Sequence, residues 1–473
     1  MKILKKLLIA LLAISIISYN SITSYSEETT SSEIDYHVTD SNDIPNWPKG
    51  PEIGAQTAVL MEANTGVILY AQGMHEHMYP ASTTKMMTAL LAAENSDMSE
   101  NVEFSYDAVF SLEDGSSNIG IDPGESMSME ECLYGLMVAS ANEVANAVAE
   151  HVGGDRETFV SMMNDRASEL GMEDTHFANA NGLFDEEHYT SAYDLALLAR
   201  EFFNNEYLAK IGNTASYHFK ATATQPDDFY VKNKHKLISG EMQYTGIKGG
   251  KTGYTEAAGE TLVTCAEQNG MVLICVVLNE ESPAQFTDTM TLFDYGFSNF
   301  EVLNVADNED RYSIENEYAF PTSVDILGSS KQILELDDNC TVIKPKNIDF
   351  DDMETLLSYE GNDEGEIVRI NYSYHGVYLG YGSVRSVEGK VASSAFDVEG
   401  VLDTVEEEEA PETEEPVFIN IVKVMTVFVA VGAFLILITF IQSVFANYNL
   451  LDNMKRRRSS KPKRRKEKDK LIF

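Results

Sequence analysis

The spacing of apolar residues changes several times along the chain, and each spacing predicts a different element. Residues 58–70 alternate apolar and polar side chains on both sides of Asn64-Thr65-Gly66, a pattern and a turn that are typical of a β-hairpin. After Pro80 the apolar residues recur at helical spacing through Leu91. A proline is tolerated in the first turn of a helix, because its missing N–H would have no partner there. We therefore expect a buried helix that opens at Pro80.

Helical spacing returns in residues 127–152, 159–170 and 191–203. The first of these segments is predicted as one long helix with a Ser-Ala-Asn step near its middle. Residues 171–191 are rich in Asn, Asp and Gly and are predicted as a loop.

Strand signals dominate after Gly246. Three β-type runs separated by turns extend to Asn279, and a helical pattern follows from Thr289 to Phe297. Helices inserted among antiparallel strands predict an α/β layered domain, which we place at residues 49–300.

A smaller all-β domain is predicted at residues 303–395. β-branched and aromatic residues are frequent there, in short alternating runs such as Tyr372 to Val377, and no pattern in this segment suggests catalysis. The chain has 473 residues, 44% of them hydrophobic, which is enough for two globular units and non-globular ends.

The N-terminal residues carry an export pattern. Three lysines within the first six residues precede an apolar run at residues 7–17, and small polar residues follow. We predict a signal peptide at residues 1–26, cleaved between about Ser21 and Ser26, with an uncleaved anchor as the alternative. Residues 27–48 are polar and acidic without periodicity, and are predicted as a tether.

The C-terminal residues predict a membrane anchor. Residues 396–416 contain a run of glutamates with Pro411, which favours an extended acidic linker. Residues 424–445 carry no charge, and as a helix they would rise about 33 Å, enough to cross the hydrocarbon core. We place a transmembrane helix at residues 417–445, with a buried core helix as the alternative.

Charge fixes the expected orientation of that span. The tail is placed at residues 446–473, and from Met454 it holds eleven Lys and Arg residues against Glu467 and Asp469. It should therefore stay cytoplasmic, and the preceding chain should lie outside. Beside a membrane such a tail can contact anionic lipid. The whole chain nevertheless has a net charge of −42, so the external part is strongly acidic and does not suit nucleic-acid binding.

The cysteine pattern does not predict a disulfide framework. The spacing of the four cysteines is too wide and irregular for a small disulfide-bonded fold. Cys265 and Cys275 flank an Asn269-Gly270 turn, which would place Cys265 opposite residue 274 and the two sulfurs on opposite faces. We expect free, buried thiols.

Ser82 and Lys85 are the first candidates for catalysis. They lie three residues apart, so on a helix both side chains share a face, with Ser82 in the positive N-terminal turn. A serine hydroxyl needs a base within hydrogen-bond reach, and a lysine amine can serve when it is neutral. Burial and the positive charge of Lys251 are both expected to lower the pKa of Lys85.

Two further motifs follow in order, Ser-Ala-Asn at residues 140–142 and Lys-Thr-Gly at residues 251–253. A Ser-x-x-Lys pair alone recurs by chance, whereas this ordered three-part set is typical of penicillin-binding proteins and class A β-lactamases. Asn142 carries both a donor and an acceptor, which suits it to hold Lys85 and a substrate carbonyl. Glycines at 250 and 253 would let a strand come close to a bound peptide.

Five blocks extend this likeness. They are PASTTKMMTALLAAE, YGLMVASANEVANAVAEHVGG, MNDRASELGMEDTHFANANGL, HYTSAYDLALLAR and GGKTGYTEAAGETLVTCA. Over about residues 52–300 the chain resembles the low-molecular-weight penicillin-binding proteins of the D-alanyl-D-alanine carboxypeptidase family. The resemblance implies a penicillin-binding-protein-like transpeptidase domain and a serine enzyme that removes the terminal D-alanine of peptidoglycan pentapeptides. It also implies covalent inhibition by β-lactams.

The resemblance also implies roles for individual residues. Ser82 would be the nucleophile, Lys85 its base, and Ser140 a proton relay toward the leaving amine. Lys251 and Thr252 would face the terminal carboxylate of the substrate. The backbone N–H groups of Ser82 and Tyr254 would form the oxyanion hole, in which one donor is typically worth about 3 kcal/mol of barrier. The substrate-binding residues predicted in this way are Asn142, Lys251, Thr252 and Gly253.

No metal or organic cofactor is expected. The nine histidines show no ligand spacing such as H-E-x-x-H, so His75, His77 and His188 are predicted to be structural.

The chain departs from the family pattern after the last core strand. Many relatives carry an arginine there that helps to bind the substrate carboxylate, whereas this chain has Leu278 to Pro283 without a basic residue. Lys251 would then carry that work alone.

Two other functions compete with this prediction. A β-lactamase would need a deacylating glutamate, usually in an E-x-x-L-N segment, and none lies between Asn142 and Lys251. A catalytically idle receptor that senses wall fragments or β-lactams and signals through the span is the other alternative.

Overall fold

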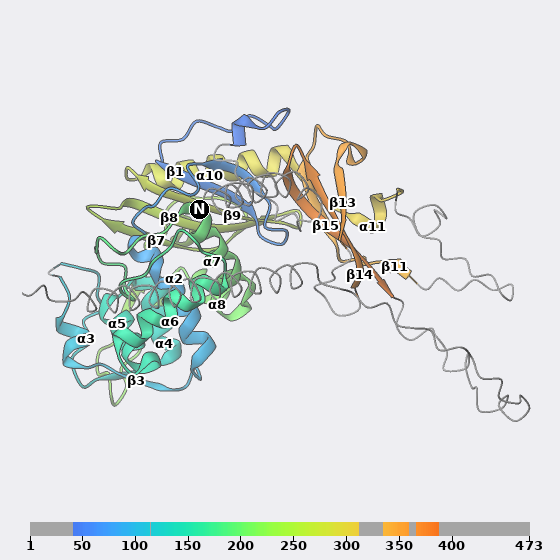
Figure 1. Cartoon of the computed structure of the whole chain (residues 1–473). Coiled ribbons are helices and arrows are strands. Elements are labelled where there is room, and N and C mark those ends of the chain that lie inside the picture. The colour runs from blue at the N-terminus through green and yellow to red at the C-terminus, as the bar shows by residue number, and fades with distance from the viewer. Residues whose placement is uncertain (1–40, 114, 312–333, 359–365, 387–473) are drawn as a thin grey trace, which may run out of the picture. The chain divides into compact units, whose positions relative to one another are not determined.

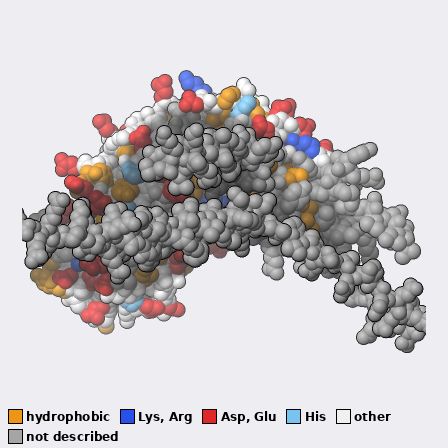
Figure 2. Space-filling model, viewed as in Figure 1, with side chains coloured by type: hydrophobic (Ala, Val, Ile, Leu, Met, Phe, Trp, Pro, Cys, Tyr) orange, Lys and Arg blue, Asp and Glu red, His pale blue; other side chains and the backbone are white. Residues whose placement is uncertain are grey.

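The computed structural model describes residues 41–113, 115–311, 334–358 and 366–386. The predicted signal peptide, acidic linker, membrane span and basic tail lie outside these residues. None of the helices within them is long and apolar enough to cross a membrane. Figure 2 shows Asp and Glu side chains spread over the visible described surface, in line with the net charge of −42.

A five-stranded sheet forms the centre of the α/β domain (Figure 1). Its strand order is β2-β1-β9-β8-β7, and every neighbouring pair is antiparallel. The strands are β1 (Thr57–Glu62), β2 (Ile68–Gln72), β7 (Ile247–Thr255), β8 (Gly259–Gln268) and β9 (Met271–Glu280). The predicted antiparallel sheet is therefore confirmed.

Helices cover both faces of this sheet. Residues along β9 alternate between two hydrophobic clusters, with Ile274 and Val276 on one face and Cys275 and Val277 on the other. Helix α10 packs on the second face, whereas most other helices lie on the first. The helices are α2 (Lys85–Asn95), α3 (Tyr106–Phe110), α4 (Met129–Tyr134), α5 (Asn142–Gly153), α6 (Arg156–Glu169), α7 (Ala192–Asn204), α8 (Glu206–Gly212), α9 (Lys236–Ser239) and α10 (Ala284–Asn299).

The hairpin turns follow the predicted chemistry. Between β1 and β2 the carboxylate of Glu62 accepts hydrogen bonds from both the N–H and the hydroxyl of Thr65. Between β8 and β9, Asn269 and Gly270 have φ values of 52° and 81°, as a two-residue turn requires. Cys265 pairs with Ile274, and all four cysteines are buried and free. The prediction for the thiols is confirmed.

The prediction of one long helix at residues 127–152 is wrong. The chain forms β4 (Ser126–Ser128), α4, one π-helical turn at Gly135–Ala139 and then α5. Ser140 interrupts the helix with φ 61° and ψ 37°, in the left-handed region. The N–H of Ala141 bonds to the carbonyl of Gly135, which closes the wide turn. Apolar spacing does not reveal such a break, because the residues on both sides still face one core.

The segment after Pro80 also differs from the prediction. Ala81–Thr84 forms a 3-10 turn and the α-helix begins only at Lys85, so Pro80 precedes the turn instead of opening the α-helix. The helix predicted at Thr289–Phe297 is longer, starting at Ala284.

Packed structure begins before the predicted boundary at residue 49. Ile44 and Trp47 are buried, and the indole N–H of Trp47 donates to the carbonyl of Leu69 at 2.9 Å. The end of the segment assigned to a tether therefore belongs to the core.

A second antiparallel sheet follows α10, as the small β domain predicts (Figure 1). Its order is β10-β12-β15-β14-β13, with β11 also paired to β15. The elements are β10 (Phe300–Asn304), α11 (Val305–Asn308), β11 (Leu334–Leu336), β12 (Thr341–Pro345), β13 (Glu354–Ser358), β14 (Glu366–Tyr374) and β15 (Val377–Ser386). Two small two-stranded antiparallel sheets complete the α/β part, β3 (Asn101–Glu103) with β4, and β5 (Ser216–Phe219) with β6 (Phe229–Lys232).

We expect Gly246→Ala to destabilise the fold more than Gly270→Ala. Both glycines have positive φ, 89° and 81°, but a Cβ at 246 would lie 2.1 Å from the carbonyl oxygen of Glu267, whereas one at 270 meets nothing within 4 Å. Gly270→Ala should lower the free energy of unfolding by about 1–2 kcal/mol, the cost of the backbone conformation alone. The clash at 246 should add about 1–3 kcal/mol.

Urea unfolding followed by the fluorescence of Trp47, the only tryptophan, measures both variants. Equal losses in the two variants would show that β7 can move away from β8 without cost.

Candidate active site

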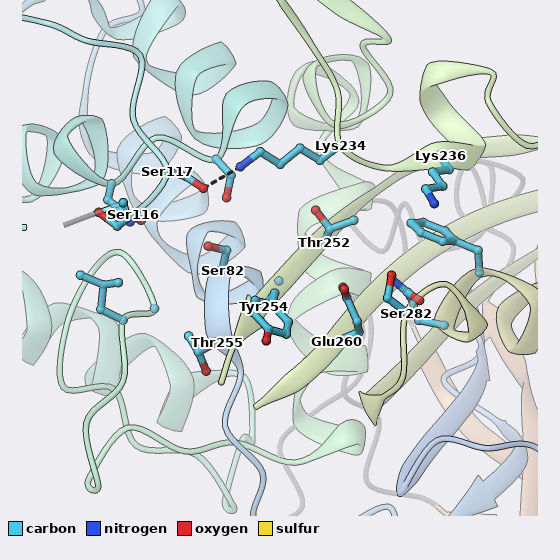
Figure 3. Close-up of a pocket in the computed structure, with 18 residues that line it drawn as sticks. Ser82, Ser116, Ser117, Lys234, Lys236, Thr252, Tyr254, Thr255, Glu260 and Ser282 are labelled. Carbon is cyan, nitrogen blue, oxygen red and sulfur yellow. Dashed lines mark hydrogen bonds between the residues drawn. The ribbon is translucent and has the colours of Figure 1, made fainter. Parts of the chain in front are cut away.

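All three motifs meet at one cleft of about 430 Å³. Ser82 comes from the 3-10 turn, Ser140 from the break before α5, and Asn142 from the first position of α5. Thr252 and Gly253 come from the edge strand β7. Figure 3 shows Ser82 and Thr252 pointing into this cleft from opposite walls. The structure thus brings together residues that are far apart in the sequence.

Lys85 lies beneath Ser82 and is completely buried. Its Nζ lies 3.0 Å from Ser82 Oγ and 2.6 Å from Asn142 Oδ1, and it also bonds to the backbone carbonyl of Asn181. These contacts hold the amine within hydrogen-bond reach of the hydroxyl, as the sequence predicted for a nucleophile and its base.

The environment favours the neutral form of this amine. Burial lowers the pKa of Lys85 to about 7, with repulsion from Lys234 as the second cause and attraction to Glu143 acting in the opposite direction. Lys251 was the neighbouring charge expected from the sequence; Lys234 is the one that lowers the pKa of Lys85, and Lys85 in turn lowers that of Lys251. Near neutral pH a large share of Lys85 is therefore unprotonated and able to accept a proton.

Lys251 points toward Ser140. Its Nζ lies 3.0 Å from Ser140 Oγ and 2.7 Å from the carbonyl of Thr252, and its side chain is buried. Burial, followed by repulsion from Lys85 and Lys234, lowers the pKa of Lys251 well below its usual value. Each serine hydroxyl thus has one lysine amine beside it, Lys85 at Ser82 and Lys251 at Ser140.

Backbone strain marks both serines. Ala81, which precedes Ser82, and Ser140 both have positive φ, 50° and 61°. Such residues cost about 1–3 kcal/mol each, and they persist only where the surroundings hold them. The hydroxyl of Thr84 donates to the carbonyl of Ala81, and the hydroxyl of Thr261 donates to that of Pro80. These bonds hold the nucleophile's turn in place from within and from β8.

The glycines of β7 are needed for packing. A Cβ at Gly253 would lie 2.7 Å from the backbone nitrogen of Ser82, and one at Gly250 would lie 2.7 Å from the ring of His235. Gly253 thus lets the edge strand approach the nucleophile, while Gly250 makes room for a buried histidine and not for a peptide. Tyr254 follows with its side chain 65% exposed at the cleft. The oxyanion-hole role of the Ser82 and Tyr254 N–H groups stays a prediction.

Several residues in and around the cleft were not predicted from the sequence. Asn181 bonds Lys85 through its carbonyl and Asn146 through its side chain, and Lys234 donates to Ser117 Oγ at 2.6 Å. Glu143 accepts from the N–H of Ile119 at 2.6 Å, so it fixes the loop that carries Ser117. The only sequence signal was the Asn- and Gly-rich composition of the 171–191 loop.

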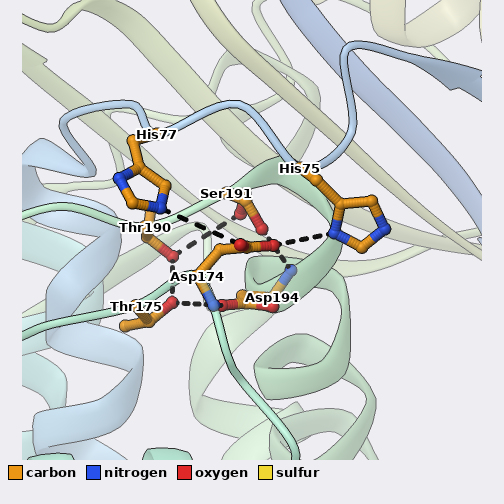
Figure 4. Close-up of polar contacts among 7 residues, drawn as sticks. All are labelled: His75, His77, Asp174, Thr175, Thr190, Ser191 and Asp194. Atoms are coloured by element: carbon orange, nitrogen blue, oxygen red, sulfur yellow. Dashed lines mark hydrogen bonds and ion pairs between the residues drawn. The ribbon is translucent and has the colours of Figure 1, made fainter. Parts of the chain in front are cut away.

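A polar network outside the cleft fixes that loop (Figure 4). Asp194 accepts from the N–H of Asp174 and the hydroxyl of Thr175, and Asp174 pairs with His75 at 2.7 Å. Burial raises the pKa of Asp194 to about 6, while the Thr175 hydrogen bond opposes this shift. The network joins the segment before Ser82, the loop that carries Asn181 and the start of α7.

The histidines predicted to be structural pack against neighbouring side chains or form hydrogen bonds with them. His77 stacks on Tyr189 with ring centroids 4.5 Å apart, and the buried His188 lies 2.8 Å from Thr84 Oγ1. Burial lowers the pKa of His188 to about 4, so its ring is neutral. Among the described residues, no three His, Cys, Asp or Glu side chains are grouped so as to hold a metal ion.

Comparison with known proteins gives a consistent result. A family model described as D-alanyl-D-alanine carboxypeptidase matches residues 44–282. The D-alanyl-D-alanine carboxypeptidase DacF of Bacillus subtilis is 38% identical over 253 residues, which cover 52% of this chain and 63% of that protein. DacB2 of Mycobacterium tuberculosis, which carries the same description, is 31% identical over 257 residues, covering 53% of this chain and 84% of that protein.

A solved structure extends the likeness to the second sheet. Penicillin binding protein 6B from Escherichia coli is similar with a TM-score of 0.54 and 25% identity, covering 73% of this chain and 99% of that one. This share is larger than the α/β domain alone, so the similarity includes the C-terminal β-sheet region.

We expect the Lys85 amine to titrate with a pKa of about 7 and Lys234→Gln to raise that pKa. Removing a neighbouring positive charge makes protonation of Lys85 easier, because repulsion favours the neutral amine. NMR of ¹³C-labelled lysine side chains across pH 5–10 measures the shift. Lys248→Gln, an exposed lysine paired with Glu267, is the control. If Lys234→Gln leaves the pKa of Lys85 unchanged, the inferred repulsion between the two amines is wrong.

Proposed function

This chain belongs to the D-alanyl-D-alanine carboxypeptidase family, and from this premise we propose that its cleft removes the terminal D-alanine of peptidoglycan stem pentapeptides through an acyl-enzyme on Ser82. The protein is a serine-type D-Ala-D-Ala carboxypeptidase that acts on peptidoglycan. The observation that carries the mechanism is the buried Lys85 amine, 3.0 Å from Ser82 Oγ and with a pKa lowered to about 7.

Acylation begins when the Lys85 amine takes the hydroxyl proton of Ser82. The Oγ attacks the carbonyl carbon of the penultimate D-alanine, and the C–O bond forms as negative charge moves to the carbonyl oxygen. The N–H groups of Ser82 and Tyr254 are assigned to that oxyanion. Gly253 supports this assignment, because it allows β7 to lie against the nitrogen of Ser82.

Ser140 then passes a proton to the nitrogen of the departing D-alanine as the C–N bond breaks. Its hydroxyl lies 3.0 Å from the Lys251 amine, which can restore that proton. Asn142 holds Lys85 through its side-chain oxygen and leaves its amide nitrogen for the substrate carbonyl. The proton that Lys85 took from Ser82 must then replace the one that Lys251 supplied, so that Lys85 is neutral again. Water attacks the ester, Lys85 takes a proton from that water, and it returns this proton to Ser82 Oγ as the C–O bond breaks.

β-Lactams are expected to acylate Ser82 by the same route. The cyclic amide places its carbonyl where the peptide carbonyl lies, and after ring opening its leaving group stays attached. The chain lacks the E-x-x-L-N segment that positions a deacylating glutamate in β-lactamases, so the adduct should be long-lived.

We also propose that the enzyme is anchored by the segment at residues 417–445, with the catalytic domain outside the cell and the basic tail in the cytoplasm. The sequence features at both ends support this placement. The acidic linker at residues 396–416 would hold the domain away from the membrane, and the tail would contact anionic lipid.

We expect Ser82→Ala to abolish D-alanine release. Without the hydroxyl no acyl-enzyme forms, so the rate should fall at least about 1,000-fold. The full chain in detergent is incubated with a muramyl pentapeptide, and D-alanine is followed by mass spectrometry. Ser161→Ala, an exposed serine on α6, is the matched control and should retain wild-type activity.

Two outcomes would change the assignment. D-Alanine release by Ser82→Ala would place the nucleophile elsewhere. A penicillin adduct on Ser82 in a wild-type protein that releases no D-alanine would favour the second candidate, a penicillin-binding receptor without carboxypeptidase activity.

Reporter fusions test the proposed topology. Alkaline phosphatase joined after residue 400 should be active, because it would lie outside, whereas the same enzyme joined after residue 473 should be inactive. Activity of both fusions, or of neither, would contradict a single span in this orientation.

A further inference from the structure

The end of the cleft beyond Thr252 presents charges that the mechanism above does not use. Three charged residues line the cleft within the described part of the chain, namely Lys234, Lys236 and Glu260. Figure 3 shows Lys236 and Glu260 beyond Thr252, on the side away from Ser117. We assign the departing D-alanine to this end of the cleft and the acyl group to the side of Ser116 and Ser117.

Two of the lysines near the Lys-Thr-Gly motif already have hydrogen-bond partners. The Lys251 amine contacts Ser140 and the carbonyl of Thr252 and is buried, so it does not line the cleft. Lys234 donates to Ser117 Oγ at 2.6 Å on the opposite side. The expectation that Lys251 alone meets the terminal carboxylate therefore does not fit the position of its amine.

The amine of Lys236 has no such partner. It is the first residue of α9 and is partly exposed at the cleft, with its Nζ 5.6 Å from the ring centroid of Phe286. Its side-chain amine forms no hydrogen bond or ion pair with the residues that the structure describes. A lysine held over an aromatic ring, with its three N–H donors unused, suits an anionic ligand.

Gln285 points to a polar ligand at the same end. It is buried and lines the cleft, yet its Oε1 has no hydrogen-bond partner. An amide can rotate by 180°, which places its NH₂ group where that oxygen lies and offers a donor to a carboxylate. An unsatisfied buried amide in a protein usually has a ligand or water as its partner.

Glu260 has the opposite effect on an anion. It pairs with Tyr254 across β7 and β8, and its half-buried carboxylate lines the same end. Burial raises the pKa of Glu260, while Ser282 and Lys236 act against that shift. The attraction of an anion to Lys236 is thus reduced by a nearby negative group.

We propose that Lys236 is the specificity-determining residue that binds the terminal carboxylate of the substrate, and that Glu260 limits this attraction. The proposal rests on the proposed carboxypeptidase function. It explains how a chain with no basic residue between Leu278 and Pro283 can recognise a free carboxyl end. Lys251 is left to serve Ser140.

The test compares substrates with and without the terminal charge. Diacetyl-L-Lys-D-Ala-D-Ala and its C-terminal amide are given to the full chain in detergent, and kcat/KM is measured for each. Lys236→Gln should lower the ratio of acid to amide kcat/KM about tenfold, mainly through KM of the acid, because one charge-assisted contact is lost. Lys236→Arg should keep the ratio within about threefold of wild type, since it keeps the positive charge.

Two further variants control the interpretation. Glu260→Gln should raise the ratio about threefold, because it removes a repulsive charge. Lys232→Gln removes a nearby exposed lysine that pairs with Glu241 outside the cleft, and its ratio should match wild type. A ratio in Lys236→Gln equal to wild type would overturn the proposal. An equal loss on both substrates would also overturn it, because that result indicates a structural role.

A second readout does not depend on carboxypeptidase activity. Acylation of Ser82 by benzylpenicillin is compared with acylation by its carboxyl methyl ester, and Lys236→Gln should lower the ratio of these rates about tenfold. If wild type is acylated but releases no D-alanine, the proposed function fails, while this ratio still decides the role of Lys236. An unchanged penicillin ratio would overturn that role.

Discussion

The burial of the Lys85 amine is the constraint on which the rest of the site depends. Removing an amine from water is costly unless its hydrogens find acceptors. Here the contacts come from the 3-10 turn, from α5 and from the 171–191 loop. Because three separate segments supply the partners, each must be held in position independently, and much of the surrounding structure does this.

The supporting contacts surround this amine. Asn146 on α5 bonds the side chain of Asn181, and Thr88 on α2 bonds the carbonyl of Ala180. Gly182 has φ 83° and approaches the carbonyl of Ala81 so closely that a Cβ there would overlap it. The loop thus packs directly on the strained turn that carries the nucleophile. Strain at Ala81 and Ser140 persists because their neighbours are fixed, in line with sites whose geometry is set before substrate arrives.

The sequence predicted the parts of this site that depend on local spacing. Ser82 and Lys85 do meet, the strands after Gly246 pair in antiparallel fashion, and the Asn269-Gly270 turn places Cys265 opposite Ile274. What it missed depends on tertiary contacts. The break at Ser140 leaves the apolar spacing unchanged, so no periodicity reports it. The charge of Lys234 acts on Lys85 across a cleft between segments far apart in the chain.

The three amines of the cleft act as one electrostatic group. Repulsion among Lys85, Lys234 and Lys251 adds to burial in lowering the pKa values of Lys85 and Lys251. On a protein with a net charge of −42, Lys234 and Lys236 place positive charge at the cleft where an anionic peptide must dock. A bound carboxylate would offset part of the repulsion and ease protonation of the amines. Substrate binding would therefore help Lys85 to accept the proton of Ser82, which couples recognition of the peptide end to the chemical step.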